Sequence, residues 1–247
     1  KPSEGKITIG NISADSKKIQ KQEIYRLRGK TAMVFQNYNL FKNKTALQNI
    51  MEPMISVQGM EKKKAKEKAM EILQMIGLTE KSDSYPSQLS GGQQQRIGIG
   101  RAMAVEPEVM LIDEPTSSLD PELVGEVLSL LYKLAQNHMT MIISTHEMSF
   151  AKNIADKVIF LDQGKIIEEG EPEQFFTNPK TERAKQFLKK FGYSNYSIFK
   201  ERLESELDVR KDQIYRGYKI FNKKRLAVAV SHLVDYPLEF NDKMKLK

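Results

Sequence analysis

Short apolar runs alternate with helical patterns along most of this chain. Residues 31–36, 109–113 and 140–145 are apolar runs of strand length, and residues 5–11 and 157–170 have the alternation and turn residues of strands and hairpins. Apolar positions three and four residues apart predict helices between these runs, at residues 45–76, 91–105, 121–137, 148–156 and 171–191. Short strands separated by helices predict an α/β fold with a parallel sheet and an antiparallel pair at one end.

The C-terminal part of the chain has a different pattern. Residues 197–221 show the charged amphipathic pattern of a helix, and residues 225–234 fit either a strand or a helix. We therefore divide the chain into residues 1–193, with a helical subdomain at about residues 45–100, and residues 194–247, a C-terminal extension of unknown role.

The composition narrows the classes of protein that fit. The net charge of +7 falls on lysine-rich helical patterns without interleaved aromatic residues, so we expect solvated helix faces and no nucleic acid partner. The chain has no cysteine, which excludes a disulfide scaffold and a thiolate metal site. Its apolar runs are far shorter than the roughly 20 residues of a membrane-spanning helix, so a membrane role would need a partner.

Polar side chains stand at the ends of three predicted strands. Asp113 and Glu114 end one strand, and His146 and Gln36 end two others. Open α/β sheets bind ligands at the carboxyl ends of their strands, where adjacent carboxylates suit one Mg²⁺ ligand and one base for a water molecule. A lone histidine or glutamine at a strand end is more often structural, so the assignment of His146 and Gln36 depends on the acid pair.

The stretch LSGGQ, residues 89–93, predicts an anion site at the start of a helix. Ser90 supplies a hydroxyl, and Gly91 and Gly92 supply backbone amides at the positive end of the helix dipole. A serine before two glycines is usually only a loop. Its place about twenty residues before the acid pair favours a phosphate-binding role.

Together these motifs resemble the ATP-binding subunit of an ABC transporter over residues 1–193. LSGGQQQR is similar to the signature motif, VMLIDEP to the Walker B motif and SSLD to the D-loop, in the family's order and spacing. The resemblance implies the α/β fold of a P-loop NTPase, an ABC ATPase core with a parallel sheet and a helical subdomain. NYNLFKNKTALQNI, DPELVGEVL and TNPKTERAKQFL are most similar to the branch that imports polar amino acids into bacteria.

The resemblance implies ATP and Mg²⁺ as cofactors and a role for each strand-end residue. Asp113 would help to hold Mg²⁺, with Gln36 as a second ligand. Glu114 would polarise the attacking water. His146 and Gln36 would sense the terminal phosphate of ATP.

The resemblance also implies partners. Two ATPase subunits would pack head to tail, and Ser90, Gly91, Gly92 and Gln93 would serve the nucleotide of the opposite subunit. Asp120 would cross the interface between them. The pair would sit on transmembrane permease subunits at the cytoplasmic face of the plasma membrane, and through these would serve an extracytoplasmic solute-binding protein.

One family motif has no match in the sequence. The family binds ATP through the Walker A motif, G-x-x-x-x-G-K-[ST], but IYRLRGKT at residues 24–31 has Ile24 where the first glycine belongs and leads into a strand. We therefore expect an N-terminally incomplete core that is inactive alone. Without its phosphate-loop strand, we expect the sheet to expose two inner edges.

Two functions remain in view. The first is an ATP-hydrolysing subunit that powers import of polar amino acids. The alternative is a catalytically incomplete partner subunit that only donates its signature motif to an intact ATPase. A DNA-repair ATPase is discounted, because residues 36–89 leave no room for the long coiled coil of those relatives.

Overall fold

The computed structural model describes residues 4–193 with their side chains and residues 226–231 by their backbone. The strands are β1 (Lys6–Ile9), β2 (Ile12–Asp15), β3 (Thr31–Val34), β4 (Val109–Asp113), β5 (Met141–Thr145), β6 (Lys157–Asp162), β7 (Lys165–Gly170) and β8 (Leu226–Ser231). The helices are α1 (Lys21–Arg28), α2 (Ala46–Ser56), α3 (Lys62–Met75), α4 (Gly91–Met103), α5 (Pro121–Gln136), α6 (Met148–Ile154), α7 (Pro172–Thr177) and α8 (Glu182–Lys190), with short 3₁₀ turns at Thr79–Lys81 and Pro86–Gln88. The amphipathic pattern at residues 197–221 lies outside the described residues.

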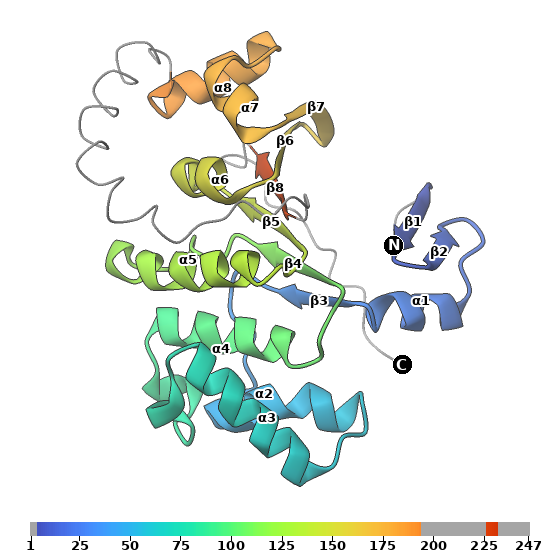
Figure 1. Ribbon diagram of the computed structural model, residues 1–247, viewed down its shortest axis with the longest axis vertical. Coiled ribbons are helices and arrows are strands. Elements are labelled where there is room, and N and C mark those ends of the chain that lie inside the picture. The colour runs from blue at the N-terminus through green and yellow to red at the C-terminus, as the bar shows by residue number, and fades with distance from the viewer. Residues whose placement is uncertain (1–3, 194–225, 232–247) are drawn as a thin grey trace.

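A six-stranded sheet forms the centre of the molecule, in the order β3-β4-β5-β8-β6-β7 (Figure 1). The pairs from β3 to β6 are parallel, and β7 is antiparallel to β6 at the edge. This arrangement confirms the predicted α/β fold with an antiparallel pair at one end. Strands β1 and β2 form a separate antiparallel hairpin beside α1.

Strand β8 joins the sheet from the C-terminal part of the chain. It runs parallel to β5 and β6, with Val228 opposite both Ile143 and Val158. The expectation of two exposed inner edges is therefore wrong, because β8 occupies the place between β5 and β6 and pairs with both. Of the two structures left open for residues 225–234, the strand is the one found at Leu226–Ser231.

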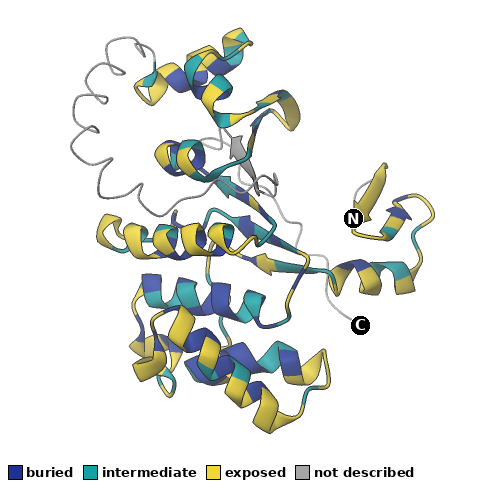
Figure 2. Ribbon diagram, viewed as in Figure 1, coloured by how far each residue is buried: buried dark blue, intermediate teal, exposed yellow. Residues whose placement is uncertain are grey.

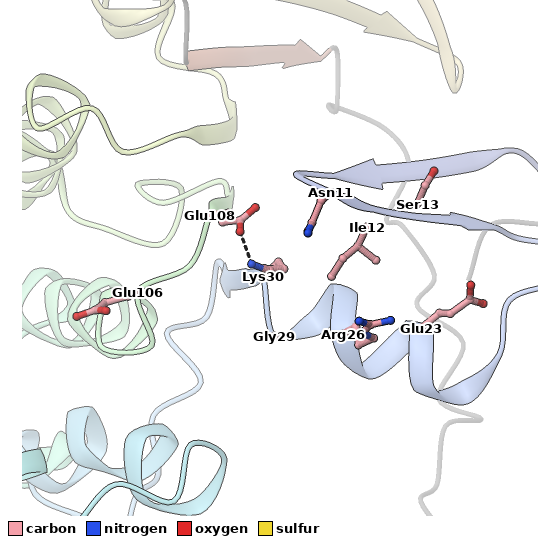
Figure 3. Close-up of a pocket in the computed structure, with 9 residues that line it drawn as sticks. All are labelled: Asn11, Ile12, Ser13, Glu23, Arg26, Gly29, Lys30, Glu106 and Glu108. Atoms are coloured by element: carbon pink, nitrogen blue, oxygen red, sulfur yellow. Dashed lines mark hydrogen bonds and ion pairs between the residues drawn. The ribbon is translucent and has the colours of Figure 1, made fainter.

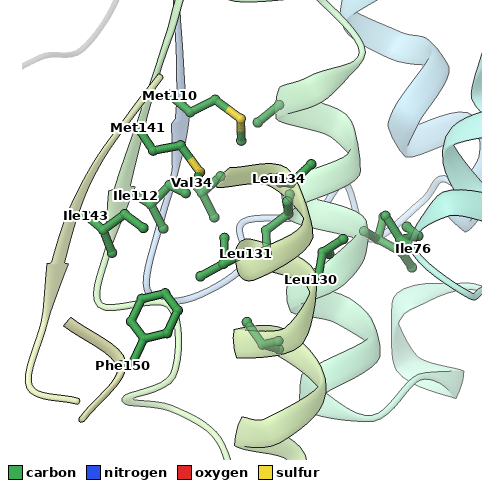
Figure 4. Close-up of a cluster of buried hydrophobic side chains, with 14 of the residues drawn as sticks. Val34, Ile76, Met110, Ile112, Leu130, Leu131, Leu134, Met141, Ile143 and Phe150 are labelled. Atoms are coloured by element: carbon green, nitrogen blue, oxygen red, sulfur yellow. The ribbon is translucent and has the colours of Figure 1, made fainter. Parts of the chain in front are cut away.

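The largest core lies between the sheet and the helices that cover it (Figures 2 and 4). Apolar side chains from the strands face α5 and α6, and all of the following are buried: Val34, Met110, Ile112, Met141 and Ile143 on the strands, Leu130, Leu131 and Leu134 on α5, and Phe150 on α6. Leu134 lies four residues after Leu130 and three after Leu131, so the three leucines share one face of α5.

Helices α2, α3 and α4 pack together beside the sheet (Figure 1). The helix predicted over residues 45–76 is divided into α2 and α3 by residues 57–61, where Gly59 has a positive φ of 67°. Ala65, Ala69, Ile72 and Ile76, which contributed to that prediction, are all buried. Gly100 on α4 allows a close approach, because a Cβ atom there would lie 3.0 Å from Ile72 Cγ2. No helix within residues 4–193 has both the length and the apolar character needed to cross a membrane.

The helix predicted over residues 171–191 is divided into α7 and α8. Pro179 disfavours helical backbone at the residue before it, and α7 ends at Thr177. Thr181 then caps α8, because its side chain accepts a hydrogen bond from the Ala184 N–H at 3.2 Å. Local backbone chemistry therefore breaks a pattern that periodicity alone reads as continuous.

Glu168 on β7 fixes the turn between these two helices. The side chain is buried, and its carboxylate accepts hydrogen bonds from Lys180 N at 2.8 Å and from Thr181 N and Oγ1 at 2.9 Å each. Burial raises the pKa of Glu168, but the hydrogen bonds outweigh burial and hold this pKa below its ordinary value.

We expect Glu168→Gln to lower the free energy of unfolding by about 2 kcal/mol at pH 7, through weaker hydrogen bonds to an uncharged amide. Because the folded-state pKa is lowered, the ionised carboxylate stabilises the fold above about pH 4.3, and this contribution is lost as the pH falls through the folded-state pKa. Urea unfolding of both proteins between pH 7 and pH 3 measures the difference.

Glu169→Gln is the matched control. Glu169 is the exposed neighbour, and its ion pair with Lys157 is solvent-accessible, so its replacement should change stability little. A difference between Glu168→Gln and the unaltered chain that did not change with pH would contradict the role of the carboxylate charge.

Candidate functional site

Asp113 and Ser144 meet at the carboxyl ends of two adjacent strands. In the parallel pair β4 and β5, Asp113 lies opposite Ser144, and the Ser144 Oγ donates a hydrogen bond to Asp113 Oδ1 at 2.6 Å. Ser144 was not among the predicted site residues. Its position two residues before His146 in an apolar strand was the available signal.

Glu114 has a left-handed backbone conformation, with φ of 43°. Its N–H donates to the Ser144 carbonyl oxygen at 3.1 Å and to Ser144 Oγ at 3.0 Å, and its carbonyl accepts from Ser117 Oγ at 3.0 Å. This conformation costs a non-glycine residue roughly 1–3 kcal/mol and persists only where its surroundings hold it. Such strain is concentrated at functional sites.

The imidazole of His146 contacts the carboxylate of Glu114. His146 Nδ1 lies 2.7 Å from Glu114 Oε2, and the two side chains are 48% and 15% exposed. His146 Nε2, the other ring nitrogen, lies 3.7 Å from Glu147 Oε1. The structure therefore joins two residues that lie 32 positions apart in sequence.

Gln36 lies at the same edge of the sheet but does not join this cluster. It follows β3, which pairs with β4 so that Val34 is opposite Ile112, and its side chain is exposed. Within residues 4–193, no hydrogen bond connects Gln36 with Asp113, Glu114 or His146.

Helix α4 begins at the glycines, as predicted, and Ser90 is its N-cap. The Gln93 N–H donates to Ser90 Oγ at 3.3 Å, and Gln93 Oε1 accepts from the Ser90 N–H at 3.0 Å. This reciprocal capping box fixes the start of the helix. Ser90 is exposed and its hydroxyl is an acceptor in this pair, so its proton is available to a ligand oxygen.

Asp120 and Tyr38 form a second polar group near the start of α4. Asp120 is the exposed N-cap of α5, and Tyr38 Oη donates to the Ser118 carbonyl oxygen at 3.0 Å. Burial and, secondarily, the Asp120 charge raise the pKa of Tyr38 above its ordinary value. Tyr38 was not among the predicted site residues, although it lies two residues after Gln36.

The side chains at the ends of β4 and β5 that could bind a metal ion offer mainly oxygen atoms. The described part of the chain has no group of three or more histidine, cysteine or acidic side chains arranged to hold a metal. Mg²⁺ instead uses one or two carboxylates together with substrate phosphates and water. Asp113, with the Ser144 hydroxyl beside it, fits that donor set.

The stretch IYRLRGKT has the opposite order of elements from a phosphate loop. Residues of α1 lead through Gly29 and Lys30 into β3, whereas a phosphate loop follows a strand and opens a helix. Figure 3 shows the pocket beside it, about 600 Å³ in volume, between α1, the β1–β2 hairpin and Glu106 and Glu108. Lys30 pairs with Glu108 there, and none of the predicted site residues lines this pocket.

The parallel sheet, with polar side chains at the carboxyl ends of its strands, has the arrangement in which open α/β folds bind ligands. The family model described as "ABC transporter" matches residues 1–117. A second model, described as "AAA domain, putative AbiEii toxin, Type IV TA system", matches residues 85–151.

Curated relatives define the family. The chain is 56% identical to the probable amino-acid import ATP-binding protein YxeO of Bacillus subtilis, over 78% of this chain and 77% of the relative. It is 52% identical to the L-cystine import ATP-binding protein TcyC of the same organism, over 76% of each chain. It is 50% identical to the glutamine transport ATP-binding protein GlnQ of Geobacillus stearothermophilus, over 75% and 76%. The chain belongs to the ATP-binding family of ABC transporters.

Solved structures agree with this assignment. The dimeric, post-hydrolysis structure of the ATP-binding cassette MJ0796 bound to ADP and Pi has a TM-score of 0.60 and 33% sequence identity, over 70% of this chain and 75% of that one. The expected P-loop NTPase fold and ABC ATPase core are thus confirmed. An ATPase of this family binds nucleotide and works with a second ATPase subunit and with permease subunits.

Proposed function

We propose that this chain is an ATP-hydrolysing subunit that powers import of polar amino acids through an ABC transporter. The observation that carries the proposal is the network of Asp113, Ser144, Glu114 and His146 at the ends of β4 and β5. The relatives named for import of amino acids, cystine and glutamine support the substrate class.

The strained backbone and the His146 contact support a role for Glu114 as the group that polarises the attacking water. His146 Nε2 and the exposed Gln36 side chain would contact the terminal phosphate. Asp113, together with Gln36, would hold Mg²⁺, which when bound neutralises charge that develops on the transferred phosphoryl group. The hydrogen bond from Ser144 orients the Asp113 carboxylate for this task.

The start of α4 would serve a nucleotide held mainly by a second ATPase subunit. Ser90 would donate from its hydroxyl, and Gly91 and Gly92 would present amides with the helix dipole behind them. Gln93 maintains this geometry through its capping box with Ser90. The exposed Asp120 at the start of α5 would cross the interface between the two subunits.

We assign the ATPase domain to residues 1–193 and a C-terminal extension to residues 194–247, from which β8 joins the sheet of that domain. The ATPase pair would associate with permease subunits at the cytoplasmic face of the plasma membrane. Through the permease it would serve an extracytoplasmic solute-binding protein.

The alternative function is that of a partner that only donates its signature motif to an intact ATPase. Under this alternative, Ser90 matters to catalysis and Glu114 does not. Separate tests of the two residues therefore distinguish the two functions.

We expect Ser90→Arg to abolish the support that this chain gives to a partner's nucleotide. The full chain is mixed with a related ABC ATPase subunit that has its own Walker A motif but carries arginine in place of its signature serine. The rate of Mg-ATP hydrolysis is then measured as the concentration of the chain is increased. The unaltered chain should restore hydrolysis, and Ser90→Arg should lower the restored rate roughly a hundred-fold, as when a donor to a transition-state oxygen is lost.

Ser87→Arg is the control, because Ser87 is exposed in the 3₁₀ turn before the signature motif and contributes no predicted ligand. Equal rates with Ser87→Arg and Ser90→Arg would contradict the assignment of the signature face. Failure of the unaltered chain to restore any hydrolysis would also contradict it.

A further inference from the structure

The segment after β3 is fastened to helix α4. Tyr38 and Asn39 both have left-handed backbone conformations, with φ of 59° and 47°. Arg101, in the last turn of α4, donates from Nη1 to the Asn39 carbonyl oxygen at 2.8 Å and from Nη2 to that of Tyr38 at 3.3 Å. One planar guanidinium thus holds two consecutive strained residues and sets the direction of the Tyr38 side chain.

The side chain of Tyr38 reaches the start of α4 and the loop before α5 together. Its Oη donates to the Ser118 carbonyl oxygen at 3.0 Å. A Cβ atom on Gly91 would lie 2.8 Å from the same Oη and 3.1 Å from Leu119 Cδ2. The missing side chain of Gly91 therefore leaves the space through which Tyr38 reaches Ser118.

Leu119 packs against the hydrophobic core, but the other hydrogen bonds of the loop from Ser117 to Asp120 are local. Within residues 4–193, Ser117 bonds to Glu114 and the Leu119 N–H to the Thr116 carbonyl, all three or fewer residues away. Asp120 caps α5 without a side-chain hydrogen bond to the helix. Among the described residues, the hydrogen bond from the Tyr38 hydroxyl is therefore the one that connects Ser118 to a distant part of the chain.

We propose that Tyr38 is a positioning residue, which holds the signature segment Ser90–Gln93 and the loop Ser117–Asp120 in fixed register with the segment that carries Gln36. The proposal rests on the proposed function, in which the first two segments face a second ATPase subunit and Gln36 faces the terminal phosphate. A movement at Gln36 would then be transmitted through one tyrosine to both segments of the subunit interface.

The first test measures hydrogen–deuterium exchange in the full chain by mass spectrometry. Tyr38→Phe keeps the ring and removes only the donor to Ser118, so we expect the amides of residues 115–123 to exchange about five-fold faster, the loss of one net hydrogen bond. Tyr132→Phe is the control, because Tyr132 is half-exposed on α5 away from this contact. Exchange in residues 115–123 equal to that of the control would overturn the proposal.

A second variant reaches the same contact from the other side. Gly91→Ala places a methyl group against Tyr38 Oη and should displace the tyrosine, with faster exchange in residues 115–123. Combining it with Tyr38→Phe should give less than the sum of the two effects, because both changes remove the Tyr38 contact and only Gly91→Ala also crowds Leu119 Cδ2. Fully additive effects would overturn direct contact as the mechanism.

The last arm separates this proposal from the proposed function. In the mixture with the signature-blocked related subunit, Tyr38→Phe should raise the chain concentration that gives half-maximal ATP hydrolysis about five-fold, while Tyr132→Phe leaves it unchanged. If the unaltered chain gives no stimulation, the proposed function fails while the exchange measurement still decides the role of Tyr38. If stimulation occurs and Tyr38→Phe leaves the half-maximal concentration unchanged, the positioning role is overturned.

Discussion

Glu114→Gln is expected to lower the rate of ATP hydrolysis at this chain's own strand-end cluster roughly a hundred-fold or more, the usual contribution of a general base. The amide can still accept the hydrogen bond from His146 Nδ1 and occupies nearly the same volume, so the geometry at the ends of β4 and β5 should persist. What is lost is the negative charge that polarises water.

The measurement requires that only one site can turn over. The full chain is mixed with a related ABC ATPase subunit in which only the catalytic glutamate is replaced by glutamine. The rate of Mg-ATP hydrolysis by the mixture is then measured. Glu173→Gln, an exposed glutamate on α7, is the control and should leave the rate unchanged. Equal rates with Glu114→Gln and Glu173→Gln would rule out Glu114 as the base, and no hydrolysis by the unaltered chain would favour the signature-donor alternative.

Val228→Pro is expected to destabilise the fold by about 3 kcal/mol. β8 is an interior strand that pairs with β5 on one side and β6 on the other. Proline removes a ladder donor and fixes φ outside the range of an interior strand, and a backbone group left without a partner costs about 1–3 kcal/mol. Urea unfolding followed by circular dichroism measures the change.

Val228→Thr is the matched control, since it keeps both the backbone N–H and the β-branched shape that strands favour. A stability within about 0.5 kcal/mol of this control would show that Leu226–Ser231 does not complete the sheet in solution. In that case another segment or molecule would have to pair with the edges of β5 and β6.

Local patterns predicted most of the elements. The three apolar runs correspond to β3, β4 and β5. The residues whose spacing indicated a helix, Ala65, Ala69, Ile72 and Ile76, are buried on α3 and at the residue after it. These signals work because the side-chain periods of strands and helices are set by local backbone geometry. Two predicted helices, residues 45–76 and 171–191, are each divided in the structure. Periodicity does not register such breaks, which come from local backbone effects such as that of Pro179 on the residue before it.

The site could be predicted in part. The position of Asp113, Glu114 and His146 at one edge follows from the rule that parallel strands end together, so the sequence was enough to group them. Ser144 and Tyr38 escaped notice because no motif gives either residue a role, although Tyr38 lies within NYNLFKNKTALQNI. Each acts through a partner about 30 or more positions away, Asp113 and Ser118 respectively.

The sequence by itself determined the family, most of the strands and helices, and the residues that carry polar chemistry at strand and helix ends. The tertiary structure alone decided that β8 enters the sheet between β5 and β6, that Glu114 is held in a left-handed conformation beside His146, and that Tyr38 joins two loops. The reason is physical: periodicity and capping are local properties of the chain. Strand register and side-chain contacts between distant segments depend on which surfaces pack together, and packing is settled only when the whole chain folds.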